Sequence, residues 1–123
     1  MRYLIMLFER RGVVDAADAS AVSERRARHR AAAETLTRAG VFVWSQLLVG
    51  PHAATSLRWS ADGLVVTAQA QTDGRDPLSR LYLVACADLD DAIMIAQDLA
   101  SRGRAVVEIR PVICDESVEN PPV

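Results

Sequence analysis

The chain contains no lysine and only two cysteines and two histidines. All 14 of its basic residues are arginine, which excludes a Schiff base on a lysine amine. Cys86 and Cys114 have no histidines close by in the sequence, so they are a poor metal site and are predicted to be free thiols. The sequence therefore predicts no metal and no cofactor, and it leaves His29 and His52 as the candidates for acid–base work near neutral pH.

Long apolar runs are also missing, because the longest are only the size of strands. A membrane-spanning helix needs about 20 apolar residues, so no membrane association is predicted. The start of the chain passes directly from Met1 and Arg2 into a strand pattern without the features of a signal peptide, which predicts a cytoplasmic location. The composition, 50% hydrophobic with a net charge of −2, indicates a single domain over residues 1–113 and an acidic, proline-containing tail over 114–123.

Residues 81–113 are typical of a strand, a capped helix and a second strand. Strand formers dominate both ends of this unit. Asp88 is predicted to cap the helix, Asp98 and Arg102 to pair one turn apart, and Gly103 to end it. An apolar face at helical spacing is predicted to pack on a sheet; it comprises Leu89, Ala92, Ile93, Ile95, Ala96 and Leu99.

The rest of the chain predicts further elements from the same signals. They are a central strand at 3–8, a polar connection at 9–18, a helix from a cap at Ser20 or Ser23 to Ala39 with Gly40 at its end, a strand at 41–48 broken by Gly50-Pro51-His52, a hairpin at 55–60 and 64–68 around Ala61-Asp62-Gly63, and a loop at 69–80.

This order predicts an α+β fold, a ferredoxin-like sandwich with an added β-hairpin, in which two helices cover one face of an antiparallel sheet. The strands at 3–8 and 81–86 are apolar on both sides. We therefore expect a second copy of the chain to cover the other face of the sheet, in a homodimer.

Short motifs along about nine tenths of the chain carry a resemblance to a known family. They are Leu48, Pro51, Ala54 and Arg58, then Thr67, then Tyr82, Leu83, Asp88, Leu89, Asp90 and Ala92, the closing Val-Glu-Ile-Arg-Pro-Val with Glu108, Arg110, Pro111 and Val112, and, nearer the N-terminus, His29, Leu36 and Ala39-Gly40. With these residues the chain resembles the YCII-related proteins of the DGPF type. The resemblance implies a dimeric α/β barrel built on a ferredoxin-like fold.

The family signature itself is replaced. An ungapped comparison places Ala68, Gln69, Ala70 and Gln71 where the family carries Asp-Gly-Pro-Phe. It also places Ser79 and Arg80 where two glycines are usual. The activity of the family therefore does not transfer to this chain by resemblance alone.

His29 is the first candidate catalytic residue. Helical spacing places it on the arc that must face the sheet, together with Val22, Arg25, Ala32, Ala33 and Leu36. The resemblance implies an inward histidine on this helix as a general base. The alternative is a core histidine that is hydrogen-bonded to a backbone group.

Arg25, one turn before His29, is a candidate substrate-binding residue that can grip a carboxylate or enolate oxygen. The alternative is that Arg25 extends beyond the sheet edge into water. Arg80 and His52 are further candidate substrate-binding residues, although an exposed, idle imidazole is the alternative for His52.

Other charged residues have structural interpretations. Glu108 and Arg110 are expected at the dimer interface, paired with the other copy or with Arg80. The basic run at 25–30 is spread around its helix, so no nucleic-acid binding is predicted. Two ion pairs at four-residue spacing are expected on this helix; they are Glu24 with Arg28 and Glu34 with Arg38.

Two functions follow from this pattern. The first is a cofactor-free lyase or isomerase that uses His29 as an acid–base on a small anionic or aromatic substrate. The second is a non-catalytic ligand-binding module with an accessory or regulatory role, which the missing signature favours.

Overall fold

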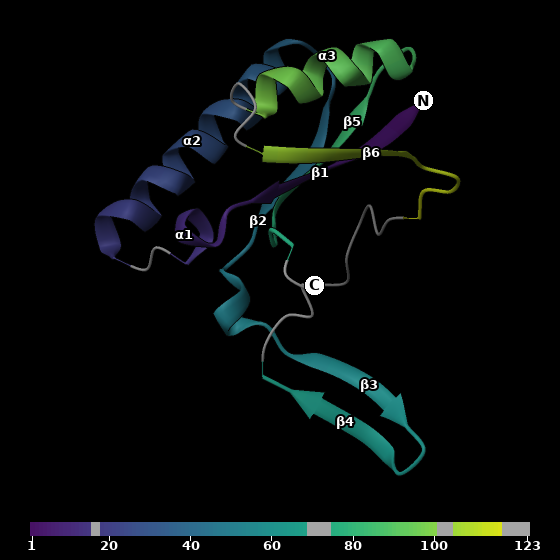
Figure 1. Ribbon diagram of the computed structural model, residues 1–123. Coiled ribbons are helices and arrows are strands. Elements are labelled where there is room, and N and C mark those ends of the chain that lie inside the picture. Colours follow the sequence, from purple (N-terminus) through teal and green to yellow (C-terminus); the bar gives the residue numbers. More distant parts are fainter. Residues whose placement is uncertain (16–17, 69–74, 101–104, 117–123) are drawn as a thin grey trace, which may run out of the picture.

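The computed structural model describes residues 1–15, 18–68, 75–100 and 105–116, and it has an α+β fold (Figure 1). A four-stranded antiparallel sheet, a separate β-hairpin and helices packed on the sheet make up the chain. The elements in chain order are β1 (Arg2–Glu9), α1 (Arg11–Val14), α2 (Ala19–Arg38), β2 (Phe42–Leu47), the 3-10 helix η1 (Pro51–Ala53), β3 (Ser56–Ser60), β4 (Gly63–Thr67), β5 (Leu78–Ala85), α3 (Leu89–Leu99) and β6 (Ala105–Pro111).

The sheet has the strand order β2-β5-β1-β6, and all neighbours are antiparallel. The strand at 3–8 is central as predicted, because β1 pairs with β5 on one side and β6 on the other. This order is compatible with a ferredoxin-like arrangement.

Strand β5 begins at Leu78, so residues 78–80 belong to a strand and not to the loop that was predicted over 69–80. Leu78 pairs with Phe8 and Arg80 pairs with Leu7, which leaves Ser79 in a β-bulge between them. A bulge turns an additional side chain toward one face, and Ser79 is fully buried here.

The core lies between the sheet and the helices. Alternate residues of β1 and β5 face the helices and are buried there; with their helical partners they are Tyr3, Ile5, Leu7, Tyr82, Val84, Leu36, Ala92, Ala96 and Leu99. The apolar face predicted for α3 is only partly used, since Leu89 and Ile93 remain exposed.

Helix α3 starts as the sequence predicts, because the Asp88 side chain accepts a hydrogen bond from the Asp91 amide at 3.0 Å. The helix ends at Leu99 with Ala100 as its C-cap. Arg102 and Gly103 lie outside the described residues, so the predicted Asp98–Arg102 pair and the predicted helix end at Gly103 fall there too.

Helix α2 confirms its predicted end but not its predicted start. Its N-cap is Asp18, whose side chain accepts from the Ala21 amide, so the capping role assigned to Ser20 or Ser23 is wrong. Gly40 has a φ of 75°, and the Val41 amide donates to the Leu36 carbonyl at 3.1 Å, as in a Schellman motif. The short helix α1 lies within the connection that was predicted to be only polar, and it buries Val14.

The two ion pairs predicted along α2 do not form. Neither Glu24–Arg28 nor Glu34–Arg38 is within salt-bridge distance, and Arg38 instead donates to the Thr35 hydroxyl at 3.4 Å. Arg28 and Arg38 are therefore not neutralised by a glutamate of the same helix.

The hairpin is confirmed, with Ala61 and Asp62 as a two-residue turn and Gly63 at a φ of 119°. Figure 1 shows β3 and β4 projecting from the end of β2, away from α2 and α3. Among the described residues, no helix is long and apolar enough to span a membrane.

The outer face of the sheet, opposite the helices, carries Glu108 and Arg110. Glu108 pairs with Met6 in the register of β1 and β6, whereas Arg80 pairs with the inward-facing Leu7. Directly paired residues share a face, so Arg80 lies on the other side of the sheet. The predicted pairing of Glu108 or Arg110 with Arg80 within one chain is therefore wrong.

The φ of Gly40 predicts a cost for any side chain at this position. Gly40→Ala is expected to lower the free energy of unfolding by about 1 kcal/mol, because a Cβ disfavours the left-handed region. No atom lies within 4 Å of the added Cβ, so the cost is conformational alone. Urea unfolding followed by circular dichroism measures it. Gly12→Ala in α1 is the control and should not destabilise the protein; equal losses for both variants would contradict the role of Gly40.

Candidate functional site

The imidazole of His29 lies between α2 and the sheet, as the helical arc predicts. Its Nε2 is 2.9 Å from Ser45 Oγ of β2, and its Nδ1 is 3.0 Å from the Tyr82 hydroxyl of β5. Ser45 and Tyr82 are directly opposite in the β2–β5 register, so the two hydroxyls hold the ring from both sides. The partners of His29 are thus side chains rather than the backbone group of the alternative interpretation.

Arg80 extends this contact into a network across three strands. Its Nη1 donates to the Tyr82 hydroxyl at 3.2 Å, its Nε to Glu9 of β1 at 2.8 Å and its Nη2 to the Leu99 carbonyl of α3 at 3.1 Å. The Arg80 and Glu9 side chains are only 14% and 18% exposed. The polar chain therefore runs from Glu9 through Arg80, Tyr82 and His29 to Ser45, beneath α2.

The directions of these bonds restrict the proton positions. Because Arg80 donates to the Tyr82 oxygen, the hydroxyl proton of Tyr82 is free to bond His29 Nδ1, and Nε2–H then donates to Ser45. In the other tautomer Nδ1–H donates to the Tyr82 oxygen and Nε2 accepts from the Ser45 hydroxyl. In both tautomers, Ser45 Oγ is the hydrogen-bond partner of His29 Nε2.

The environment of His29 favours its neutral form. Burial lowers the pKa of His29, and the charges of Arg80 and then Arg25 lower it further. Burial raises the pKa of Tyr82, while Arg80 acts in the opposite direction. A neutral imidazole and a neutral phenol are thus present together near pH 7, which is the state in which the proton positions above apply.

Arg25 points toward the sheet rather than into water. Its Nη2 donates to Ser79 Oγ at 3.0 Å and to the Leu48 carbonyl at 3.3 Å. Burial lowers the pKa of Arg25, Glu9 acts against this shift, and Arg80 and Arg28 add to it. No salt bridge joins Arg25 to a carboxylate among the described residues, and both of its hydrogen-bond acceptors are neutral.

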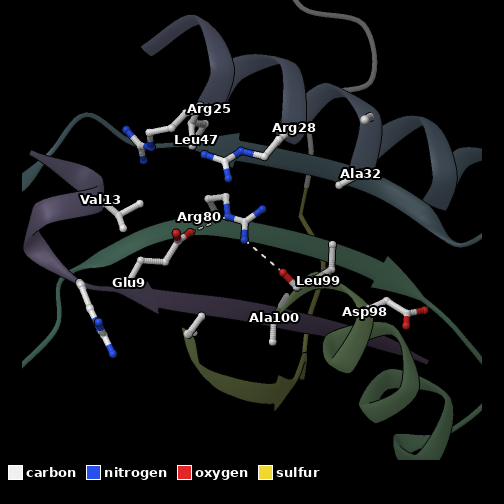
Figure 2. Close-up of a pocket in the computed structure, with 13 residues that line it drawn as sticks. Glu9, Val13, Arg25, Arg28, Ala32, Leu47, Arg80, Asp98, Leu99 and Ala100 are labelled. Atoms are coloured by element: carbon white, nitrogen blue, oxygen red, sulfur yellow. Dashed lines mark hydrogen bonds and ion pairs between the residues drawn. The ribbon is translucent and has the colours of Figure 1, made fainter. Parts of the chain in front are cut away.

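Two cavities border Arg25, and both have volumes typical of small-molecule sites. The first, of about 810 Å³, lies between α2, α3 and the sheet. Figure 2 shows the Arg80 guanidinium of β5 directed to Glu9 and to Leu99, with Arg28 extending from α2 above it. Its lining includes four arginines against two carboxylates; they are Arg10, Arg25, Arg28 and Arg80 against Glu9 and Asp98.

The second cavity, of about 630 Å³, lies beside the edge strand β2. It is lined by His29, Ser45 and His52, together with Arg25 and two further α2 arginines, and no carboxylate lines it. An excess of arginine with no carboxylate in the lining gives this cavity a positive potential, which favours anions over cations.

The predicted site residues divide between the two cavities. His29, Arg25 and His52 line the second cavity, and Arg25 joins Arg80 in the first. His52 is exposed, and its Nδ1 is 3.2 Å from Asp15 Oδ1, so its ring is turned partly toward the end of α1.

Sequence reasoning missed Ser45, Ser79 and Tyr82 as site residues. Strand alternation from the inward-facing Val84 could have placed Tyr82 on the helix side, since residues two apart share a face. Ser45 and Ser79 had no comparable signal, because the β2–β5 register and the bulge in β5 decide their positions.

No family model matches this chain, and no curated protein matches it. Within the described part of the chain, no three His, Cys, Asp or Glu side chains are grouped to hold a metal ion. The chemistry of the cavities is therefore argued from their own residues.

The charge of Arg25 acts directly on His29, which can be measured. Arg25→Gln is expected to raise the pKa of His29, because a positive charge that disfavours the imidazolium is removed. Titration of the His29 ring protons by NMR reports the shift. Arg26→Gln, one residue along α2, is the control, and an equal upward shift in both variants would contradict a specific effect of Arg25.

The lowered pKa of His29 also predicts how stability depends on pH. The unfolded chain binds a proton at His29 near the ordinary pKa of about 6.5, while the folded chain does not. The free energy of unfolding should therefore fall as the pH decreases from about 7.5 to 5.5. His29→Gln should show a shallower decrease in urea titrations over this range. Parallel curves for the two proteins would contradict this linkage.

Proposed function

We propose that this protein is a cofactor-independent lyase or isomerase that moves a proton on a small organic anion, with His29 as the acid–base and Arg25 as the anion-holding group. The observation that carries the proposal is the placement of a neutral histidine in a cavity lined by arginines and by no carboxylate. His52, at the mouth of the same cavity, and Arg80, in the adjoining one, are proposed substrate-binding groups.

Arg25 is suited to hold an anion because part of its guanidinium is unused. Only Nη2 is engaged, with Ser79 and Leu48, while the Nε and Nη1 hydrogens have no hydrogen-bond acceptor among the described residues. A guanidinium in this state binds a carboxylate or an enolate oxygen by charge-assisted hydrogen bonds. Burial strengthens such bonds, since the local dielectric is lower than in water.

The proton step uses Ser45 as the contact between His29 and the substrate. A carbon acid gives its proton to Ser45 Oγ as the Ser45 proton passes to His29 Nε2, and the electron pair of the C–H bond moves into the adjacent carbonyl. Arg25 then stabilises the enolate oxygen. Nε2 can take this proton in the tautomer in which Nδ1–H donates to the Tyr82 oxygen, and Tyr82 continues to accept from Nδ1 until Nε2 returns the proton.

An anion also adjusts the strength of the base. Burial lowers the pKa of His29 in the free protein, and the fields of Arg80 and Arg25 lower it further. A bound carboxylate offsets the field of Arg25, which makes His29 more basic when the substrate is in place. This coupling lets the same arginine attract the substrate and leave the base active.

We further propose that the chain is a YCII-like protein with a ferredoxin-like fold that forms a dimeric α/β barrel. Support comes from the strand order and from the outer face of the sheet. That face carries large apolar side chains, of which Trp44 is 39% and Val106 is 63% exposed. A second sheet packed on this face would remove them from water.

A non-catalytic ligand-binding or accessory module is the alternative. One observation favours it, because both ring nitrogens of His29 are already engaged by hydroxyls. The same arginines would then hold an anion without any proton transfer.

Hydrogen exchange on carbon acids tests the catalytic role. Pyruvate, acetoacetate and phenylpyruvate would be incubated with the protein in D₂O, and loss of the carbon-bound proton signal next to the carbonyl would be followed by NMR. The protein should accelerate exchange of at least one of them. His29→Ala should reduce this rate by about 100-fold or more, as expected for loss of a general base. Ser45→Ala should also reduce it, because the proton path is interrupted.

Arg38→Gln at the far end of α2 is the control and should leave the rate unchanged. Binding of these anions, seen as shifts of the His29 ring signals, without any exchange above the buffer rate would support the accessory module instead. Exchange that survives His29→Ala would remove His29 as the base.

A further inference from the structure

The β3–β4 hairpin carries an uncovered apolar face. In its register Leu57 is opposite Val66 and Trp59 is opposite Leu64, so the four side chains lie on one face. They are 64%, 60%, 80% and 48% exposed, respectively. The other face is more polar and carries Arg58 opposite Val65, together with Ser56, Thr67 and Ser60.

A two-stranded hairpin with such a face is not expected to remain uncovered. An isolated hairpin is marginally stable in water, and it gains stability when its apolar face packs on another surface. A contiguous patch of this kind on a soluble chain marks an interaction site. Figure 1 shows that the helices and the sheet of the same chain lie away from the hairpin.

The chain itself offers a surface of matching chemistry. The outer face of the four-stranded sheet carries many large apolar side chains, which include Leu4, Met6, Phe8, Trp44, Leu81 and Val106. The four hairpin side chains have no charge among them, and this sheet face holds Glu108 and Arg110 as opposite charges on one edge strand. Neither surface therefore requires a charged partner.

The areas also favour a second copy. A large apolar side chain buries about 100 Å², so the hairpin face alone supplies about half of the 800 Å² per partner that a standard interface buries. The hairpin and the sheet face together reach this size. Because the same chain carries both, a two-fold axis can join the two sheet faces and add each hairpin face to the same closed contact.

We propose that the β3–β4 hairpin is a dimerisation arm, whose face of Leu57, Trp59, Leu64 and Val66 packs against a second copy of this chain. The proposal extends the homodimer proposed above and does not depend on proton transfer at His29. The arm follows η1 directly, and His52 of η1 lines the second cavity. Docking of the arm would thus fix the position of η1 and, with it, of His52 in the lining of the second cavity.

Two variants with the same change of net charge test the arm. Leu57→Glu with Trp59→Glu places two carboxylates on the apolar face, and Arg58→Glu changes the opposite face by the same charge. Sedimentation velocity over a concentration series gives the dimer dissociation constant. The double variant should raise it at least about 30-fold, as expected for loss of a central contact, while Arg58→Glu leaves it near the wild-type value. Circular dichroism checks that both variants are folded.

A second measurement keeps the arm testable should the double variant not fold. In Trp44→Phe, the remaining indole is Trp59, and its emission should shift to longer wavelength as the protein is diluted through the dissociation constant. A wild-type protein that is monomeric at all concentrations would overturn both the homodimer and the arm. A dimer that both charge variants leave intact, or a Trp59 emission that does not change on dilution, would overturn the arm alone.

Discussion

The guanidinium of Arg80 is the constraint on which the site depends, because a charge that is only 14% exposed must be matched on every side. Its three partners belong to three elements, Glu9 of β1, Tyr82 of β5 itself and the last carbonyl of α3 at Leu99. A cation at a helix C-terminus is favourable, since the unpaired carbonyls carry partial negative charge. One side chain therefore ties the end of α3 to the sheet and orients the tyrosine that holds His29.

The two inward-facing arginines, Arg80 and Arg25, differ in whether a carboxylate forms an ion pair with them. Arg80 has Glu9 as a counter-ion, whereas Arg25 has only the neutral oxygens of Ser79 and Leu48. Arg25 therefore adds positive potential to both cavities. Burial and the charge of Arg80 disfavour a protonated His29, and the charge of Arg25 adds to this effect while it favours an anionic ligand.

Helix ends and turns that depend on neighbouring residues could be predicted from the sequence. The contacts of the candidate site, which join residues far apart in the sequence, could not. Asp88 as a helix cap, Gly40 as a helix end and the turn before Gly63 each depend on neighbours in the sequence. The contact of Glu9 with Arg80 joins residues 71 positions apart, and the partners of His29 come from the register of β2 with β5. Arg80 was assigned to a loop because Pro77 and Asp73-Gly74 precede it. Pairing with β1 overrides that local signal and draws residues 78–80 into the sheet.

Ser79 and Arg80 also show why the proposed likeness to the YCII-related proteins would not by itself supply an activity. Where the pattern of those proteins usually has two glycines, this chain has Ser79 and Arg80. Ser79 accepts from Arg25 at the bulge, and Arg80 donates to the Tyr82 hydroxyl that contacts His29. Glycines have no side chains for either contact, so a site with glycines here would have to hold its arginine and its histidine by other means. The polar network beneath α2 therefore depends on side chains of this sequence, and its chemistry follows from the contacts of Ser79 and Arg80.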